Sequence, residues 1–255
     1  MKKLAVLLAV TLSLSLAACS SSKDNGKKDG QLSGSITVFA AASLTDTFNT
    51  LGSDFETAHS GTKIAFNYGG SSALATQIDQ GADGDVFASA APTNMDDVTK
   101  AGSASHPVTF VKNTMEIAAA PGNPKHIAAV ADLAGPGVKV ALCEATVPCG
   151  AVAAEVFKNA GVSVTAAANE PDVKSTLAIV ESGEVDAGMV YVTDVKAAGS
   201  KVVGVPIPAN QNASTDYPIA ALKNSKNPAL AKAFVDYVLS TAGQQVLSAA
   251  GFQSP

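Results

Sequence analysis

Three short segments rich in small side chains stand where a strand pattern gives way to a helix pattern. They contain Ser43, Ser71 and Cys149, each beside an Ala or Gly. A helix N-terminus presents backbone N–H groups without partners inside the helix, together with a partial positive charge. Small side chains let a ligand approach these groups, and a serine adds a hydroxyl donor. Each serine alone fits a simple N-cap, but three such segments indicate a site for a small anion.

The elements around these segments alternate between strands and helices, which is typical of α/β proteins. Runs of β-branched residues predict strands, and apolar residues spaced by three or four predict helices. We expect strands at 35–40, 63–68, 85–89, 115–120, 139–142, 187–192 and 202–207, and helices around 44–55, 74–78, 94–100, 150–160, 172–183 and after Pro228. Because ligands bind at the carboxyl ends of strands in such sheets, the three segments are expected to meet.

The composition narrows the choice of ligand. The chain has 255 residues, 47% of them hydrophobic and 15% charged, with a net charge of −5. Nucleic acid is therefore not an expected partner, since it needs a basic face or aromatic platforms and only 5% of the residues are aromatic. All 17 cationic residues are lysines. Without an arginine clamp, an anion must be held mainly by neutral donors or by lysine.

Enzyme signatures are missing from the sequence. It contains no Gly-x-Ser-x-Gly elbow, no GxxxxGK[ST] phosphate loop and no GxGxxG motif, and its three histidines are scattered. The acidic pair in Asp83-Gly84-Asp85 fits a turn that leads into a strand better than it fits acid–base chemistry. We therefore predict a protein that is not an enzyme and that holds neither a cofactor nor a directly coordinated metal.

The first residues carry an export signal. Lys2 and Lys3 precede an apolar run from Leu4 to Leu16, which is too short to span a membrane but fits a signal peptide. The run ends in Leu-Ala-Ala before Cys19, which resembles a bacterial lipobox; an ordinary signal peptide with an incidental cysteine is the alternative. We predict a lipoprotein signal peptide at 1–19 with Cys19 lipidated, and a flexible tether at 20–33. The protein would be exported and lipid-anchored to the outer face of the cytoplasmic membrane.

The two remaining cysteines lie six positions apart. In an exported protein such a pair favours a disulfide between Cys143 and Cys149. Two free thiols and a metal site are the alternatives, and no histidine lies near in sequence to complete a metal site.

Several ordered segments resemble those of bacterial periplasmic molybdate-binding proteins, the substrate-capturing components of molybdate ABC transporters. The resemblance covers the chain from Ser35 to its end. It rests on residues 38–45 (VFAAASLT), 71–78 (SSALATQI), 84–90 (GDVFASA), 147–150 (VPCG), 172–174 (DVK), 188–194 (GMVYVTD) and 217–220 (YPIA). It implies a type II periplasmic-binding-protein fold, in which two α/β lobes are joined by a hinge with the ligand cleft between them. With the two strand–helix sets of the sequence, we expect lobe 1 at 34–114 plus 208–255, and lobe 2 at 115–207.

The resemblance also implies which residues contact the ligand. The family's anion contacts fall on Ser43, Ser71, Cys149, Val173 and Tyr191. The two serines would donate hydroxyl and backbone N–H groups, Tyr191 its phenol, and the other two only backbone N–H. Cys149 departs from the family's alanine, which a backbone donor tolerates. The simpler interpretations are that Val173 is a core residue of a helix and that Tyr191 is an interlobe tyrosine.

Molybdate suits such a site because its oxygens, fully deprotonated near neutral pH, accept hydrogen bonds and cannot donate them. The resemblance therefore implies molybdate as ligand, with tungstate nearly isosteric, and the permease and ATPase of an ABC importer as partners of a monomeric binding protein. The main alternative is a binding protein for another tetrahedral oxyanion such as sulfate. An enzyme or a structural surface lipoprotein on the same fold is an alternative of a different class.

Overall fold

The computed structural model describes residues 32–255, so the predicted signal peptide, Cys19 and most of the tether lie outside the described residues. The strands of the described part are β1 (Gly34–Ala41), β2 (Thr62–Gly69), β3 (Val86–Ala88), β4 (Val108–Ala119), β5 (Val140–Cys143), β6 (Ala168–Glu170), β7 (Ala187–Tyr191), β8 (Val203–Pro206) and β9 (Ser214–Ala221). Its α-helices are α1 (Thr45–Ala58), α2 (Ser71–Asp79), α3 (Pro92–Lys100), α4 (Pro148–Ala160), α5 (Val173–Glu181), α6 (Val192–Ala198), α7 (Pro228–Leu239) and α8 (Thr241–Ala250). The described part also contains three short 3-10 helices, η1 (Ala42–Leu44), η2 (Val130–Ala134) and η3 (Gly199–Lys201).

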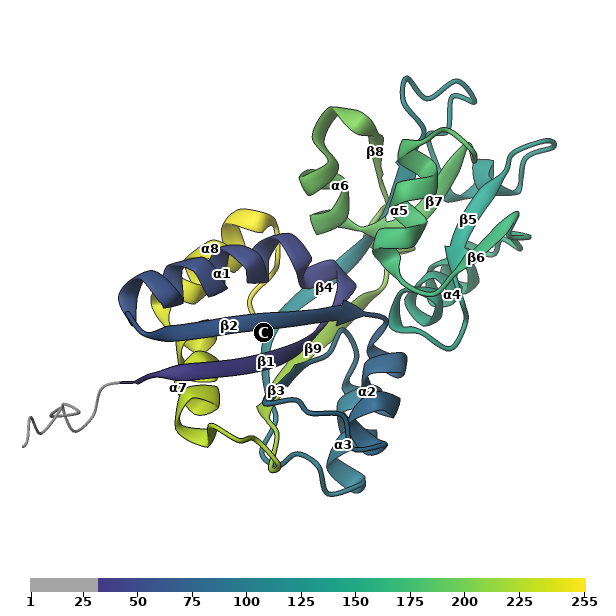
Figure 1. Cartoon of the computed structure of the whole chain (residues 1–255). Coiled ribbons are helices and arrows are strands. Elements are labelled where there is room, and N and C mark those ends of the chain that lie inside the picture. Colours follow the sequence, from purple (N-terminus) through teal and green to yellow (C-terminus); the bar gives the residue numbers. More distant parts are fainter. Residues whose placement is uncertain (1–31) are drawn as a thin grey trace, which may run out of the picture. The chain divides into compact units, whose positions relative to one another are not determined.

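The strands form two parallel sets joined by long antiparallel strands (Figure 1). In the first set β1 pairs in parallel with β2 and β3, and in the second β5 pairs in parallel with β6 and β7. We call lobe 1 the part built on β1, β2, β3 and β9 with α1–α3, α7 and α8, and lobe 2 the part built on β5–β8 with α4–α6. The two-lobed α/β architecture expected from the sequence is therefore confirmed.

Strand β4 belongs to both lobes. From Val108 to Thr114 it pairs with β9. From Met115 to Ala119 it pairs with β7, and from Glu116 to Ala119 also with β8. The apolar pattern predicts a strand only at 115–120. The first half of β4 was not predicted because the polar residues Thr109, Lys112 and Asn113 interrupt the apolar pattern there. These residues form a strand because β9 supplies the pairing partner.

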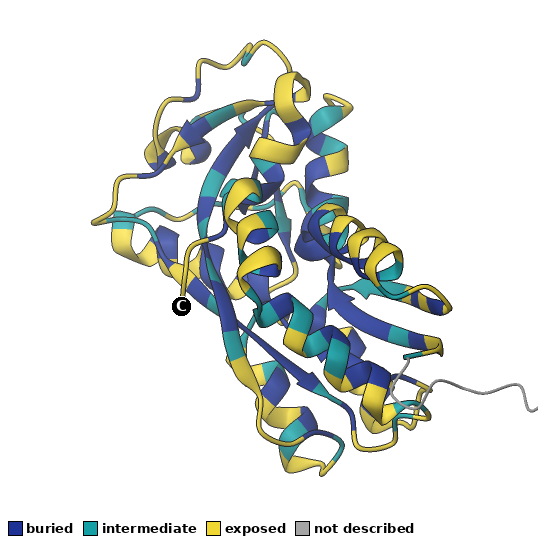
Figure 2. Cartoon of the chain, turned by 90° about the vertical axis from the view of Figure 1, so that its left-hand side faces the viewer, coloured by how far each residue is buried: buried dark blue, intermediate teal, exposed yellow. Residues whose placement is uncertain are grey.

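Alternation along β1 distributes its side chains to two faces, as the period of a strand requires. Val38 packs in a cluster with Phe48 of α1 and Phe234 of α7, whereas Phe39 packs with Leu74 of α2 on the opposite face. Lobe 1 is thus a sheet covered on both sides. Most of the core of lobe 2 forms a separate cluster drawn almost entirely from residues 115–213. Figure 2 shows the buried strands and the exposed outer faces of the helices.

The carboxyl ends of the parallel strands lead directly into the predicted ligand segments. Strand β1 continues into η1, β2 into α2, β5 into the loop before α4, β6 into α5 and β7 into α6. The short β6 and α6 were not predicted. Strand β6 has only three residues, of which two are half-buried and one is exposed, and α6 begins directly at the end of a strand, so neither has a clear periodic pattern. Within residues 32–255, no helix is long and apolar enough to cross a membrane.

Candidate functional site

A small pocket lies between the two lobes. Its lining contains all five residues that the sequence analysis predicted as ligand contacts, together with neighbours of each; the lining residues are Ala41, Ala42, Ser43, Gly69, Gly70, Ser71, Ala90, Pro148, Cys149, Asp172, Val173 and Tyr191. The volume of this cavity is about 20 Å³. Pockets for drug-sized ligands span roughly 300–1,000 Å³, so this one is suited to a smaller solute.

Three helices direct their N-termini at the pocket. Ser71 is the first residue of α2, Cys149 the second of α4 and Val173 the first of α5. N–H groups in a first helical turn have no acceptor inside their own helix, and the helix dipole makes that end partly positive. One of the three helices belongs to lobe 1 and two belong to lobe 2. The pocket therefore attracts negative charge without a cation in its lining.

The two serine hydroxyls are held by bonds within lobe 1. The Ser71 hydroxyl oxygen accepts the Ala90 N–H at 2.9 Å, which leaves the hydroxyl hydrogen free to donate elsewhere. The hydroxyl oxygens of Ser43 and Tyr217 lie 2.9 Å apart, and either can donate to the other. When Tyr217 donates, the Ser43 hydrogen is available to a ligand. Both serines are thus oriented before any ligand arrives.

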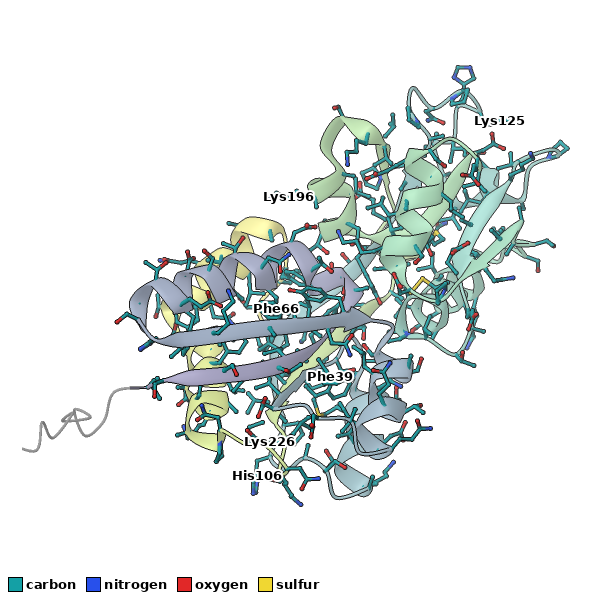
Figure 3. The ribbon with its side chains drawn as sticks, viewed as in Figure 1. Phe39, Phe66, His106, Lys125, Lys196 and Lys226 are labelled. Atoms are coloured by element: carbon teal, nitrogen blue, oxygen red, sulfur yellow. A yellow bond between two sulfur atoms is a disulfide. The ribbon has the colours of Figure 1, made fainter. Side chains whose placement is uncertain are left out.

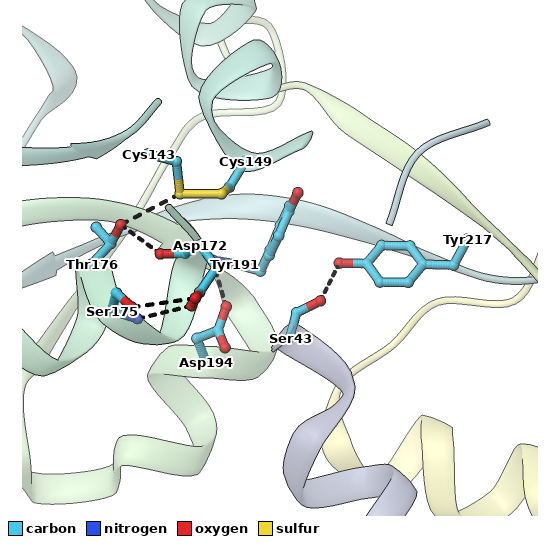
Figure 4. Close-up of a disulfide and its surroundings, with 9 residues drawn as sticks. All are labelled: Ser43, Cys143, Cys149, Asp172, Ser175, Thr176, Tyr191, Asp194 and Tyr217. Atoms are coloured by element: carbon cyan, nitrogen blue, oxygen red, sulfur yellow. Dashed lines mark hydrogen bonds between the residues drawn. A yellow bond between two sulfur atoms is a disulfide. The ribbon is translucent and has the colours of Figure 1, made fainter. Parts of the chain in front are cut away.

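Tyr191 is the last residue of β7 and is buried. Its hydroxyl has no hydrogen-bond partner of good geometry among residues 32–255. Its ring meets that of Tyr217 edge-on, with centroids 6.1 Å apart (Figure 4). Burial, followed by the neighbouring Tyr217, raises the pKa of Tyr191 well above its ordinary value. The phenol therefore stays protonated and is an unsatisfied hydrogen-bond donor. A buried polar group without a partner is costly, so a ligand that accepts this hydrogen bond would be favoured.

Cys143 and Cys149 are joined by a disulfide, with Cα atoms 5.8 Å apart (Figure 4). The bond connects the end of β5 to the first turn of α4. Because the Cys149 sulfur is engaged in the disulfide, the residue has its backbone N–H and no thiol to offer a ligand. The bond therefore restrains the helix N-terminus that lines the pocket.

One lining residue is acidic and was missed by the sequence analysis. Asp172 is the N-cap of α5, and its carboxylate accepts the backbone N–H of Ser175 at 3.0 Å and the hydroxyl of Ser175 at 3.2 Å (Figure 4). These bonds turn the carboxylate toward its own helix. An Asp directly before a helical pattern is an N-cap signal, and it could have identified this role.

A group of charges lies just outside the pocket. Lys174 of α5 contacts Asp46 of α1 at 2.7 Å and Asp194 of α6 at 3.5 Å. Asp194 is fully buried and accepts the Tyr191 N–H at 3.1 Å. Burial raises the pKa of Asp194 to about 6, although Lys174 and the Tyr191 N–H act in the opposite direction. Burial lowers the pKa of Lys174, but its attraction to Asp194 and Asp46 outweighs burial, and the net shift is upward.

Apart from the Asp172 carboxylate, which is bonded to Ser175, the polar side chains of the lining carry hydrogen-bond donors. Hydroxyl groups and helix N-termini surround a small cleft, and no group of three or more His, Cys, Asp or Glu residues within 32–255 could hold a metal ion. Oxygens that carry full negative charge accept such hydrogen bonds strongly. The fold and the site define a two-lobed binding protein for a small anion.

The sequence comparisons agree with this class. Residues 36–253 match the family described as bacterial extracellular solute-binding protein, and the chain belongs to that family. The molybdate-binding protein ModA of Mycobacterium tuberculosis is 42% identical over 252 residues, which cover 98% of this chain and 97% of the relative. The predicted class, a solute-binding protein and not an enzyme, is confirmed.

Solved structures show the same architecture. A substrate-binding domain assigned to a molybdenum ABC transporter of Clostridium difficile is 30% identical, with a TM-score of 0.66 over 87% of this chain and 99% of that one. The periplasmic molybdate-binding protein of Azotobacter vinelandii has a TM-score of 0.77 over 86% of this chain and 99% of its own, at 21% identity. At that identity the likeness concerns the fold alone.

Proposed function

We propose that this protein binds molybdate, and also tungstate, outside the cytoplasm and delivers it to an ABC importer. The observation that carries the proposal is the convergence of Ser43, Ser71, Cys149, Val173 and Tyr191 on one pocket. Each would donate to the anion: the serines through hydroxyl and N–H groups, Tyr191 through its phenol, and the other two through N–H. The relative of 42% identity, named a molybdate-binding protein, supports the same ligand.

The charge of the site supports a fully ionised ligand. A protonated oxyanion would need an acceptor for its own hydrogen, and the carboxylate in the lining, Asp172, is already bonded to Ser175. Sulfate is also fully ionised, so it remains the alternative. Selection between molybdate and sulfate would depend on how far apart the hydrogen-bond donors of the pocket lie, because molybdate, the larger ion, needs donors set further apart.

The site is complete when the two lobes stand as close together as they do in this structure. We propose that residues 34–114 with 208–255 move as lobe 1 and residues 115–207 as lobe 2, with β4 and β9 at the hinge. Ser43 and Ser71 then approach from one side, and Cys149, Val173 and Tyr191 from the other. Closure removes water from the dianion, and charge-assisted hydrogen bonds gain strength in a medium of lower dielectric constant.

The first residues and the family support a proposal for the location and the partners. We propose that the protein is a monomer held by lipid on Cys19 at the outer face of the cytoplasmic membrane. From there it would present its cargo to the permease and ATPase subunits of the importer. The family description as extracellular supports the location outside the cytoplasm.

The direct test is calorimetric titration of the mature domain with molybdate, tungstate, sulfate and phosphate. Molybdate and tungstate should bind far more tightly than the other two. A thermal melt gives a second reading, because a ligand at a thousandfold excess over its Kd stabilises the native state by about 4 kcal/mol. Tighter binding of sulfate than of molybdate would support the alternative.

A further inference from the structure

Lys174 contacts two acidic residues from different parts of the molecule. Its ammonium lies 2.7 Å from the Asp46 carboxylate of lobe 1 and 3.5 Å from the Asp194 carboxylate of its own lobe. Asp46 and Lys174 are 128 positions apart in the chain. The contact between them is therefore an ion pair that spans the cleft beside the pocket.

The position of Lys174 in its helix is unfavourable locally. It is the second residue of α5, where the partial positive charge of the helix N-terminus repels a cation. Asp46 stands at the matching position of α1, where a carboxylate is favoured. Buried Asp194 explains why a cation is needed near α5, since an unpaired buried carboxylate is costly. It does not explain Asp46, whose side chain is 63% exposed and would be solvated without Lys174.

A second lysine contacts lobe 1 along the same side of the cleft. The Lys196 ammonium of α6 donates to the Ala249 carbonyl at 2.7 Å, in the last turn of α8. Figure 3 shows Lys196 at the place where these two helices meet. A cation at a helix C-terminus interacts favourably with the helix dipole. Both interlobe contacts require that the lobes stand as close as they do in this structure.

We propose that the Lys174–Asp46 ion pair fastens the two lobes over the bound oxyanion and lengthens the time for which the ion stays bound. Lys174 is a positioning residue in this proposal, because neither it nor Asp46 lines the pocket. The inference rests on the proposed function for its ligand. It extends the proposed function because the dissociation rate would then depend on a contact that lies outside the groups that donate hydrogen bonds to the anion.

The test compares two carboxylates of one helix. Asp46→Asn removes the interlobe pair, and Asp54→Asn removes the same charge from an exposed position of α1 that has no ion pair in the described chain. The control matters because loss of any negative charge speeds the approach of an anion. Association and dissociation rates come from stopped-flow tyrosine fluorescence at several oxyanion concentrations, since Tyr191 lines the pocket.

Asp46→Asn should raise the dissociation rate roughly two- to fivefold over that of Asp54→Asn, the range that a partly exposed ion pair supports. Asp46→Lys should raise it further, because it places two cations together. Lys174→Gln closes a double-mutant cycle, in which Asp46→Asn should have no additional effect. If Lys174→Gln does not fold, because Asp194 is left unpaired, two comparisons still decide: Asp46→Asn with Asp54→Asn, and Asp46→Lys with Asp54→Lys.

Equal dissociation rates for the Asp46 and Asp54 variants would overturn the proposal, and so would an Asp46 effect that persists unchanged in Lys174→Gln. The rates are measured with whichever oxyanion the parent binds most tightly. A parent that prefers sulfate contradicts the proposed ligand and leaves this comparison intact. A parent that binds none of the oxyanions contradicts both proposals.

Discussion

Gly70 of lobe 1 and Pro171 of lobe 2 meet so closely across the cleft that a Cβ added at Gly70 would lie 2.6 Å from the Pro171 carbonyl oxygen. The same Cβ would lie 3.4 Å from a methyl carbon of Val147, which is also in lobe 2. The backbone of Gly70 has φ −62° and ψ 132°, angles that alanine adopts without strain. The requirement for glycine here therefore comes from the opposite lobe.

Gly70→Ala should weaken molybdate binding and leave the fold of each lobe intact, because the atoms that the added Cβ would meet all belong to the opposite lobe. Overpacking of this kind costs about 1–3 kcal/mol, which corresponds to roughly a fivefold to hundredfold rise in Kd. Calorimetric titration gives the affinity, and the melting temperature of the ligand-free protein checks the fold. Binding equal to that of the parent would mean that the lobes do not need to approach this closely.

The hydroxyl donors should each contribute to affinity. Ser43→Ala, Ser71→Ala and Tyr191→Phe would each leave one oxygen of a buried dianion without a partner. Hydrogen bonds to charged groups contribute about 1.5–3 kcal/mol, so Kd should rise roughly ten- to a hundredfold for each change.

The control variants for these three are conservative substitutions that leave the proposed hydroxyl donors in place. Ser72→Ala lies one residue away from Ser71, and Tyr68→Phe removes a phenol that bonds to Asn49 within lobe 1. Val173→Ala keeps its backbone N–H and should also bind nearly as the parent does. Hydroxyl variants that bind like these controls, in folded protein, would show that the site is assigned to the wrong residues.

The disulfide should stabilise the mature protein and its pocket. Mass spectrometry of natively secreted protein without reductant should show the loss of two hydrogens across Cys143 and Cys149. Replacing both by serine should lower the free energy of unfolding by roughly 2 kcal/mol, the value that loop entropy predicts for a ring this short. Urea unfolding of the parent and the double variant measures this. Two freely alkylated thiols in the secreted protein would contradict the prediction.

Asp194 should make stability depend on pH. The pKa of an aspartate is 3.8 in an open chain, and the pKa of Asp194 in the folded protein is about 6. The folded state therefore binds this proton more tightly than the unfolded state, and the free energy of unfolding falls as the pH rises from about 4 to about 6. A rise of about two units corresponds to roughly 3 kcal/mol.

Asp194→Asn isolates this effect, because its amide oxygen still accepts the Tyr191 N–H and does not titrate. Urea unfolding of both proteins between about pH 4 and 7 should show the parent losing more stability than the variant. Parallel curves for the two proteins would contradict the raised pKa of Asp194.

Cys19→Ala should release the protein from membranes. The substitution removes the sulfur that would carry the lipid, so the exported protein should move from the membrane fraction to the soluble fraction. Cell fractionation followed by immunoblotting measures the distribution, with Ser20→Ala as the matched control. A Cys19→Ala protein that remains with the membranes as the parent does would contradict lipid anchoring.

Local sequence patterns were sufficient to predict most of the strands and helices and part of the candidate site. The order of strands and helices follows from apolar spacing, and the segments around Ser43, Ser71 and Cys149 follow from small residues between a strand and a helix. The prediction of an export signal also rests on the sequence alone, since its basic and apolar segments are contiguous. Val173 and Tyr191 became candidates only through the family resemblance, because a buried valine and a buried tyrosine carry no local sign of ligand contact.

The tertiary structure decided the contacts between distant residues. It brings the Ser43 hydroxyl to that of Tyr217, 174 positions away, and Lys174 to Asp46 across the cleft. It also extends β4 back to Val108, because β9 provides hydrogen-bond partners there. Sequence patterns report the conformation of a segment and the face it buries. They do not report which polar groups meet across a cleft. Such pairs depend on how whole lobes pack, and the two residues of a pair have no regular separation in the sequence.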